Sequence, residues 1–226
     1  MKPILTTLLG LLLLIAASGC GTLKTSLTKM DTSEIDVIIE EHILSKNPCY
    51  TAGRKIEVKG IMLHSVGCPV PSGETWVKLW NREDYNRACV HAFIDAHTAV
   101  VWQTLPWNHR GWHAGGQANN THIGVEMCEP EYLKYTGGAS FTTSNLEASR
   151  DMVRRTYVAA INLFAYLCHL YHLNPLAKGV IISHSEGHAQ GVASGHQDPE
   201  HLWRQLDLPY SMDAFRQEVA KKLAEY

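Results

Sequence analysis

Five short apolar stretches along the chain have the length and pattern of β-strands. Residues 57–63 become apolar toward their end, as a buried strand does, and residues 180–182 form another short apolar run. Residues 89–94 and 99–104 flank a short turn, which predicts a β-hairpin. Residues 121–127 alternate between apolar residues and small or polar ones, so they predict a strand with one face in the core.

Segments with apolar residues at three-to-four-residue spacing predict helices between these strands. The clearest are residues 146–171 and 213–223. Residues 35–44 have similar spacing and are expected to form a short opening helix, and residues 71–88 a loop and a helix. The chain contains no internal repeat and no interior linker. We therefore predict an α/β fold in which residues 35–226 form a single domain, with a central mixed β-sheet flanked by helices.

The amino-terminal residues have a pattern that is typical of export rather than of a folded domain. Lys2 precedes an apolar run, residues 4–17, that is too short for a membrane-spanning helix. The run ends in Ala-Ser-Gly-Cys20, which resembles a bacterial lipobox; an ordinary secretory signal is the alternative. We predict a lipoprotein signal peptide over residues 1–19, then a lipidated Cys20 and a tether over residues 20–34. The protein would be lipid-anchored to a membrane of the bacterial cell envelope.

Composition narrows the classes of partner. The chain has 226 residues, of which 45% are hydrophobic and 19% are charged, ordinary values for one domain with a substantial core. A net charge of −2 and a pI of about 6.7 argue against a nucleic-acid partner, and we expect a monomer. Five cysteines follow Cys20, so at least one of them is unpaired, and none has the CxxC spacing of a zinc site.

Histidine is the one unusually frequent residue, with thirteen in the chain, and several gather near the carboxyl end. Within 18 positions the sequence places His184, His188, His196, Asp198 and His201. Imidazole and carboxylate groups suit zinc, and an open catalytic zinc site needs three protein ligands and a water. This segment begins where a predicted strand ends, so the cluster suggests, but does not by itself make, a zinc site in a surface cleft at the strand ends.

Two further groups stand on predicted strands in positions that could complete such a site. His64 directly follows a buried strand and opens a loop that contains glycine and proline. Glu126 shares the non-core face of its strand with Gly124, which leaves room for a ligand to approach the backbone. Taken alone, each has a plainer interpretation: a packed core histidine for His64, and a solvated surface carboxylate for Glu126. A metal ligand arriving from elsewhere in the chain would turn the carboxyl-terminal cluster into a site.

Several of these segments, in this order, resemble the zinc-dependent N-acetylmuramoyl-L-alanine amidases of the type-2 class, which share a fold with peptidoglycan recognition proteins. The match is carried by Ile61–His64, Val90–Ile94, Arg110–Gly115, Asn119–Glu126 and His184–Pro199, and it spans nearly the whole predicted domain. Trp-His-Ala-Gly, Ile-Gly-Val-Glu and a closing His…Asp-Pro are weak signals singly and specific together. The resemblance implies hydrolysis of the amide bond between the lactyl group of N-acetylmuramic acid and L-alanine of the stem peptide, in peptidoglycan or muropeptides.

Carried over to this chain, the resemblance implies one Zn²⁺ ion held by His64, His184 and Asp198. Asp198 keeps the Asp-Pro context of the family's third ligand, but it lies 14 residues after His184, a longer spacing than is common in the family. His188 and His196 therefore remain alternatives for the third ligand. We prefer Asp198, because it leaves His196 two residues before the ligand, where relatives often carry an auxiliary cationic lysine.

The resemblance also implies roles for residues outside the ligand set. Glu126 matches the family's catalytic glutamate, and we expect it to accept the proton of the attacking water and pass it to the leaving amine. We expect His196 to help stabilise the oxyanion. His113 and Trp112, in a loop rich in histidine and aromatic residues, and Asn120 are expected to contact the substrate.

Two other functions are compatible with the sequence. One is a non-catalytic peptidoglycan-binding module of the same fold, which would lack a zinc ligand. The other is a lipid-anchored structural protein whose histidines buffer metal. The joint presence of His64, His184, an aspartate candidate and Glu126 favours the enzyme.

Overall fold

The structure is a computed structural model, and it describes residues 37–226. The predicted signal peptide (1–19) and the predicted lipidated cysteine with its tether (20–34) lie outside the described residues. Within residues 37–226, no helix combines the length and apolar character that crossing a membrane requires. The five cysteines of this part of the chain are all free thiols.

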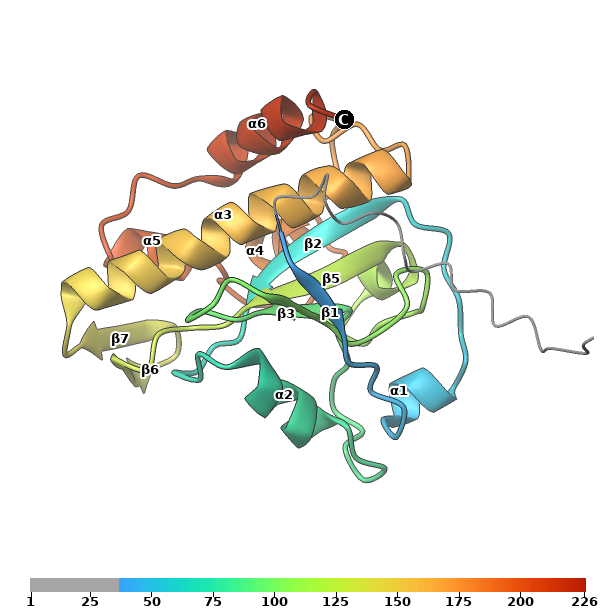
Figure 1. Ribbon diagram of the computed structural model, residues 1–226, viewed down its shortest axis with the longest axis horizontal. Coiled ribbons are helices and arrows are strands. Elements are labelled where there is room, and N and C mark those ends of the chain that lie inside the picture. Colours follow the sequence, from blue (N-terminus) through green and yellow to red (C-terminus); the bar gives the residue numbers. More distant parts are fainter. Residues whose placement is uncertain (1–36) are drawn as a thin grey trace, which may run out of the picture. The chain divides into compact units, whose positions relative to one another are not determined.

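A six-stranded mixed sheet forms the centre of the described domain (Figure 1). The strand order is β1-β4-β3-β5-β2-β8, and every neighbouring pair is parallel except the β3–β4 hairpin. The strands are β1 (Ile39–Glu41), β2 (Gly60–Ser65), β3 (Ala92–Ile94), β4 (Val101–Gln103), β5 (His122–Met127) and β8 (Ile181–Ser183). The predicted mixed sheet and the predicted hairpin are therefore confirmed.

Helices cover both faces of this sheet. On one side lie the long helix α3 (Leu146–Leu170) and α6 (Met212–Leu223), and on the other lie α1 (Pro48–Thr51) and α2 (Gly73–Trp80) (Figure 1). Trp76 and Trp80 of α2 pack on Phe93 of β3. The remaining elements are a 3₁₀ turn, a separate two-stranded hairpin and two short helices: η2 (Gln117–Asn120), β6 (Leu133–Gly137), β7 (Ser140–Thr143), α4 (His184–Ala189) and α5 (Glu200–Gln205).

The alternation within β5 divides its side chains between the core and the site. Ile123, Val125 and Met127 are fully buried in the core cluster that α3 covers. Gly124 and Glu126 point to the opposite face, as successive residues of a strand must. Burial of a whole apolar face fixes the register of the strand, since a slip by one residue would bury Glu126 in the core instead.

The prediction of an opening helix over residues 35–44 is wrong. In the part that the structure describes, Ile39–Glu41 form the edge strand β1, which pairs in parallel with β4. Val37 is buried in the core and Ile39 packs against it, whereas Ile38 is exposed. The apolar pattern of so short a segment is compatible with a helix or a strand. Here pairing with the edge of β4 provides hydrogen-bond partners for the backbone, so the strand forms.

Docking of α3 on α6 generates a testable prediction about stability. Phe164 is fully buried, and its ring contacts that of Phe215 of α6 edge-on at 5.1 Å. Replacing Phe164 with alanine leaves a cavity in the main core and should lower the free energy of unfolding by about 3–5 kcal/mol. Val158→Ala, on the same helix at a position that is 51% exposed, should change it by less than about 0.5 kcal/mol. Urea denaturation of both variants measures the difference.

Candidate metal centre and active-site cleft

The carboxyl ends of three adjacent parallel strands bring the predicted site residues together. In the register of β2 and β5, His64 is paired with Glu126, so the two side chains stand next to each other on one face. On the other side of β2, Leu63 is paired with Ser183, and His184 follows directly as the first residue of α4. This edge of a parallel sheet is where ligands commonly bind.

Three ligand atoms converge at this edge. His64 Nδ1 lies 3.0 Å from His184 Nδ1 and 3.3 Å from Asp198 Oδ2, and His184 Nδ1 lies 3.6 Å from the same oxygen. The three side chains are buried, and they form the one His, Cys, Asp or Glu cluster within residues 37–226 with the geometry to hold a metal ion. The structure thus groups the three predicted ligands, although they come from distant parts of the sequence.

Hydrogen bonds beneath His64 set which of its ring nitrogens carries the proton. His113 Nε2 lies 3.1 Å from the His122 carbonyl oxygen, which can only accept, so this nitrogen donates. Burial lowers the pKa of His113 well below its ordinary value, aided by the neighbouring His64, and the ring is therefore neutral. His113 Nδ1 then accepts from His64 Nε2 at 2.9 Å. Because burial also lowers the pKa of His64, its Nδ1 is left without a proton.

Gly124 provides the space for the His113 ring. A Cβ atom at position 124 would overlap the ring atoms of His113. The glycine two residues before Glu126 therefore lets a histidine lie against the strand, next to the candidate metal ligand His64.

A serine plays the corresponding part for His184. The Ser194 hydroxyl donates its one proton to the Ala114 carbonyl at 3.2 Å. It therefore accepts from His184 Nε2, which lies 3.2 Å away. With Nε2 donating to Ser194, Nδ1 is the ring nitrogen that His184 directs at the cluster. Two bare nitrogen lone pairs that face each other at 3.0 Å repel unless a cation lies between them, so the donor set fits a metal ion.

The carboxylate of the cluster is ionised. Burial alone would raise the pKa of Asp198, but positive charge at the facing nitrogens of His184 and His64, carried by a proton or by a bound cation, outweighs burial and holds this pKa well below the ordinary value. Its Oδ2 is also within 3.4 Å of the Ser65 backbone N–H. One carboxylate and two neutral imidazoles suit a divalent ion of the first transition row.

Glu126 lies beside this cluster in an environment that resists its charge. Burial, and then the charges of Asp198 and Glu129, raise the pKa of Glu126 well above its ordinary value. Its Oε2 is buried and makes no hydrogen bond to the described part of the chain. A buried polar atom of this kind is satisfied by a water or a ligand, and a carboxyl with a raised pKa at such a place is suited to exchange protons.

The cluster and Glu126 open into a cleft of ≈ 610 Å³. One wall comes from Trp80 and Arg87, and another from Tyr135 and the tip of the β6–β7 hairpin. His196 lines the cleft with a side chain that is 59% exposed, and its Nδ1 lies 3.7 Å from Asp198 Oδ1. The chemistry of the site is therefore accessible from solvent.

The other residues singled out in the sequence lie at different places. His113 lines the cleft from below His64, whereas Trp112 and Asn120 are outside its lining. The Asn120 amide accepts a hydrogen bond from Arg110 and donates one to Gln117. His188 is exposed on α4 and is not part of the ligand cluster.

Some residues of the site were given no role from the sequence. Asn119 accepts hydrogen bonds from the backbone N–H groups of His113 and Ala114 and so fixes the loop below His64. Glu129 is buried behind the cleft wall and is hydrogen bonded to Tyr135, which lines the cleft. Isolated polar residues in loops of this kind are frequent, and only their spatial partners distinguish them.

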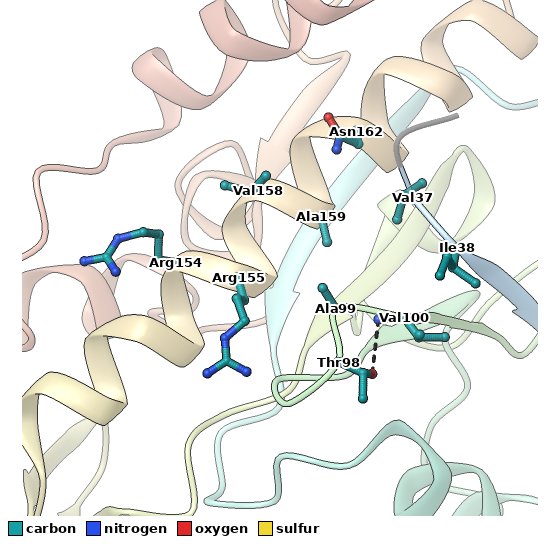
Figure 2. Close-up of a pocket in the computed structure, with 10 residues that line it drawn as sticks. All are labelled: Val37, Ile38, Thr98, Ala99, Val100, Arg154, Arg155, Val158, Ala159 and Asn162. Carbon is teal, nitrogen blue, oxygen red and sulfur yellow. Dashed lines mark hydrogen bonds between the residues drawn. The ribbon is translucent and has the colours of Figure 1, made fainter. Parts of the chain in front are cut away.

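A second cavity, of ≈ 370 Å³, lies away from these groups (Figure 2). It is bounded by Val37 and Ile38 just before β1, the turn over residues 98–100 and one face of α3. Its walls are mainly aliphatic, with Arg154 and Arg155 toward one end, and none of the metal-cluster residues lines it. It offers no chemistry comparable with that of the cleft.

Comparison with known proteins agrees with this site. The sequence profile that describes N-acetylmuramoyl-L-alanine amidases matches residues 53–201, which include His64, Glu126, His184 and Asp198. The chain belongs to the N-acetylmuramoyl-L-alanine amidase family. The family that the sequence motifs predicted is thus confirmed, and the amidase profile covers all the strands and helices that supply the metal cluster.

Individual relatives are distant. The N-acetylmuramoyl-L-alanine amidase XlyA of Bacillus subtilis (strain 168) is 36% identical over 58 residues, which are 23% of this chain and 20% of XlyA. The aligned stretch therefore spans about a fifth of that curated relative. The structure of Staphylococcus aureus hydrolase AmiA with its ligand superposes with a TM-score of 0.60 at 22% identity, over 82% of each chain. The XlyA catalytic domain gives 0.56 at 19% identity, over 81% of this chain and 99% of that domain. These structures share the amidase fold.

The ligand cluster predicts how metal binding responds to mutation. Asp198→Ala removes one of three ligand atoms and should weaken metal binding by more than the roughly 10–100-fold that loss of an outer partner costs. His188→Ala should leave it unchanged, because His188 lies outside the cluster. Metal content after dialysis, followed by competition with a chelator, measures both. Metal loss in His188→Ala with retention in Asp198→Ala would reverse the ligand assignment.

The hydrogen bond from His64 to His113 generates a second prediction for metal binding. His113→Leu removes the acceptor that holds the proton on His64 Nε2, so metal affinity should fall about 10–100-fold although no ligand is changed. His97→Ala, an exposed histidine far from the cluster in the sequence, is the control. Equal affinities in His113→Leu and the unmodified protein would show that His64 does not need this partner.

Proposed function

We propose that the protein is a zinc-dependent hydrolase that cuts the amide bond between the lactyl group of N-acetylmuramic acid and L-alanine of the stem peptide. The observation that carries the proposal is the position of Glu126, a carboxyl of raised pKa with a free oxygen, beside a His/His/Asp cluster at the bottom of an open cleft. Family membership supplies the reaction class. A non-catalytic peptidoglycan-binding module of the same fold is the alternative.

Zinc is the metal that the donor set favours. Ligand atoms at about 2.0–2.2 Å from a tetrahedral zinc ion are roughly 3.3–3.6 Å apart. The separations of 3.0, 3.3 and 3.6 Å between the atoms of His64, His184 and Asp198 are close to that range. Three protein ligands, with one position left for water, is the pattern of catalytic rather than structural zinc. Bound in this way, zinc supplies Lewis-acid polarisation of a carbonyl and lowers the pKa of water to about 7.

Glu126 is the proton-transfer group of the proposed reaction. It has no hydrogen-bond partner for Oε2 within residues 37–226, so that oxygen is available to an attacking water. Its raised pKa makes the carboxylate a stronger base than an exposed glutamate. After accepting the proton, the same carboxyl can donate it to the nitrogen of L-alanine as the amide bond breaks, which restores the starting state.

His196 is the proposed partner of the carbonyl oxygen. Its ring lies against that of His184, with 4.3 Å between centroids, on the solvent side of the cluster. An exposed imidazole there can donate a hydrogen bond to the oxygen that gains negative charge during attack. We assign substrate contacts to His113, which lines the cleft, and retain Trp112 and Asn120 as outer candidates for a long glycopeptide.

The placement of the enzyme in the cell is part of the proposal. A lipid anchor on Cys20 with a tether to the domain would hold the amidase at a membrane of the cell envelope, where peptidoglycan or its fragments are found. We propose that it works there as a monomer, since all residues of the cluster come from one chain.

Glu126→Gln tests the base. It keeps the size of the side chain but cannot accept the proton, so turnover should fall about 10²–10⁴-fold while metal content stays unchanged. Glu131→Gln, exposed on the following loop, is the matched control. The assay is mass spectrometry of purified sacculi incubated with the zinc-loaded protein, scored for peptides with a free L-alanine amine. A binding module would retain sacculi without releasing such peptides.

His196→Ala separates the roles of ligand and oxyanion partner. Loss of one oxyanion donor should lower kcat by about 10²–10³-fold, with zinc retained. If the variant instead loses zinc while Asp198→Ala keeps it, His196 is the third ligand and the assignment of Asp198 is wrong.

A further inference from the structure

A hydrogen-bonded set of three side chains lies at the wall of the cleft and is not part of the chemistry described above. Its centre is the Tyr135 hydroxyl, on β6. It donates to Glu129 Oε2 at 2.6 Å and lies 2.9 Å from His201 Nε2. Glu129 is fully buried and His201 is 4% exposed. Tyr135 and His201 both line the cleft.

The single proton of the Tyr135 hydroxyl fixes the direction of both of its hydrogen bonds, so the hydroxyl connects Glu129 with His201. Tyr135 has a single proton, which it gives to Glu129, so it accepts from His201 Nε2. The other oxygen of Glu129 accepts from the Gly67 backbone N–H at 2.9 Å. Burial raises the pKa of Glu129 to about 7, so the charge on this carboxylate depends on these donors. Without the hydroxyl, Glu129 and His201 would each lose a buried partner.

The two partners of Tyr135 belong to two segments whose relative position matters for the proposed reaction. Glu129 lies three residues after Glu126, on the chain that leaves β5. His201 lies three residues after Asp198, in the first turn of α5. Ser183 of β8 donates to Glu200 at 2.6 Å and so holds the same turn of α5 from its other side. Asp198 is thus followed by a turn that is fixed at two neighbouring residues.

We infer that Tyr135 is a positioning residue of the proposed reaction, which joins the strand of the general base Glu126 to the helix that follows the metal ligand Asp198. The inference rests on the proposed function for its effect on turnover, but its effect on the metal is independent of it. A displacement of about 1 Å between reacting groups can cost about 10²-fold in rate. A link between these two elements therefore matters even though Tyr135 touches neither the cluster nor Glu126.

Tyr135→Phe removes only the hydroxyl, and the hairpin keeps other attachments. Gln205 of α5 accepts from the Phe141 backbone N–H at 3.0 Å and donates to the Ala139 carbonyl at 2.7 Å. The β6–β7 hairpin therefore remains on α5 in the variant. Tyr132→Phe removes a hydroxyl from a half-buried tyrosine three residues earlier, in the core cluster on the α2 side, and is the matched control.

The experiment compares the full-length zinc-loaded protein with Tyr135→Phe, Tyr132→Phe, His201→Leu and the Tyr135→Phe/His201→Leu double variant. We expect Tyr135→Phe to lower kcat on a soluble muropeptide by about 10-fold or more with KM changed less than about twofold. It should also speed zinc release to a chelator by about 10-fold. Tyr132→Phe should change neither. The double variant should lose no more than the larger single loss, because both changes break one link.

Several results would overturn the inference. If folded Tyr135→Phe has unchanged kcat and unchanged zinc release, Tyr135 is not a positioning residue. A rise in KM alone would also contradict the inference, because it would make Tyr135 a substrate contact. Additive losses in the double variant would show two separate roles. If Tyr135→Phe does not fold, His201→Leu breaks the same bridge from the other side and decides by the same readouts. If the unmodified protein cuts no muropeptide but Tyr135→Phe still releases zinc faster, the positioning role stands and the proposed reaction fails.

Discussion

Parallel pairing of β2 with β5 on one side and with β8 on the other is the constraint on which the site depends. Parallel strands in register end at one edge, so His64, Glu126 and His184 meet there although 120 residues separate the two histidines. The apolar faces of the same strands lie in the core under α3. A slip in register would cost core burial as well as the site, so the hydrophobic pattern that stabilises the sheet also sets the geometry of the candidate site.

The loops complete what the sheet begins. Asn119 fixes the loop that brings His113 below His64, and Ser194 bonds the outer nitrogen of His184. The bond between His64 and His113 and the bond between His184 and Ser194 each leave the other ring nitrogen directed at the cluster. The protein thereby orients both imidazoles by contacts that lie outside the ligand set, which lowers the reorganisation that metal binding would require. The strands thus position His64 and His184, and the loops orient their rings.

The sequence predicts most of the sheet and points to the residues that the structure brings together, because the apolar patterns that reveal them are local. The apolar run before His64 and the alternation around Glu126 report directly on which side chains face a cleft, and the resemblance selects Asp198 from three candidates. Residues 37–44 and the β6–β7 hairpin could not be assigned in this way, because edge pairing and contacts with α5 decide their structure. Asn120 has a motif position, yet its amide bonds to Arg110 and Gln117 outside the cleft. The partners Ser194 and Tyr135 become visible only in three dimensions.

Gly124 has a consequence for which sequences this fold can accept as enzymes. The residue has no side chain, yet any larger residue would occupy the place of His113. Position 124 must therefore lack a side chain, because the His113 ring needs that space and is in turn hydrogen bonded to His64. A chain could keep every ligand and the glutamate, fold into the same sheet, and still be a poor metalloenzyme because of one added methyl group two residues before its base.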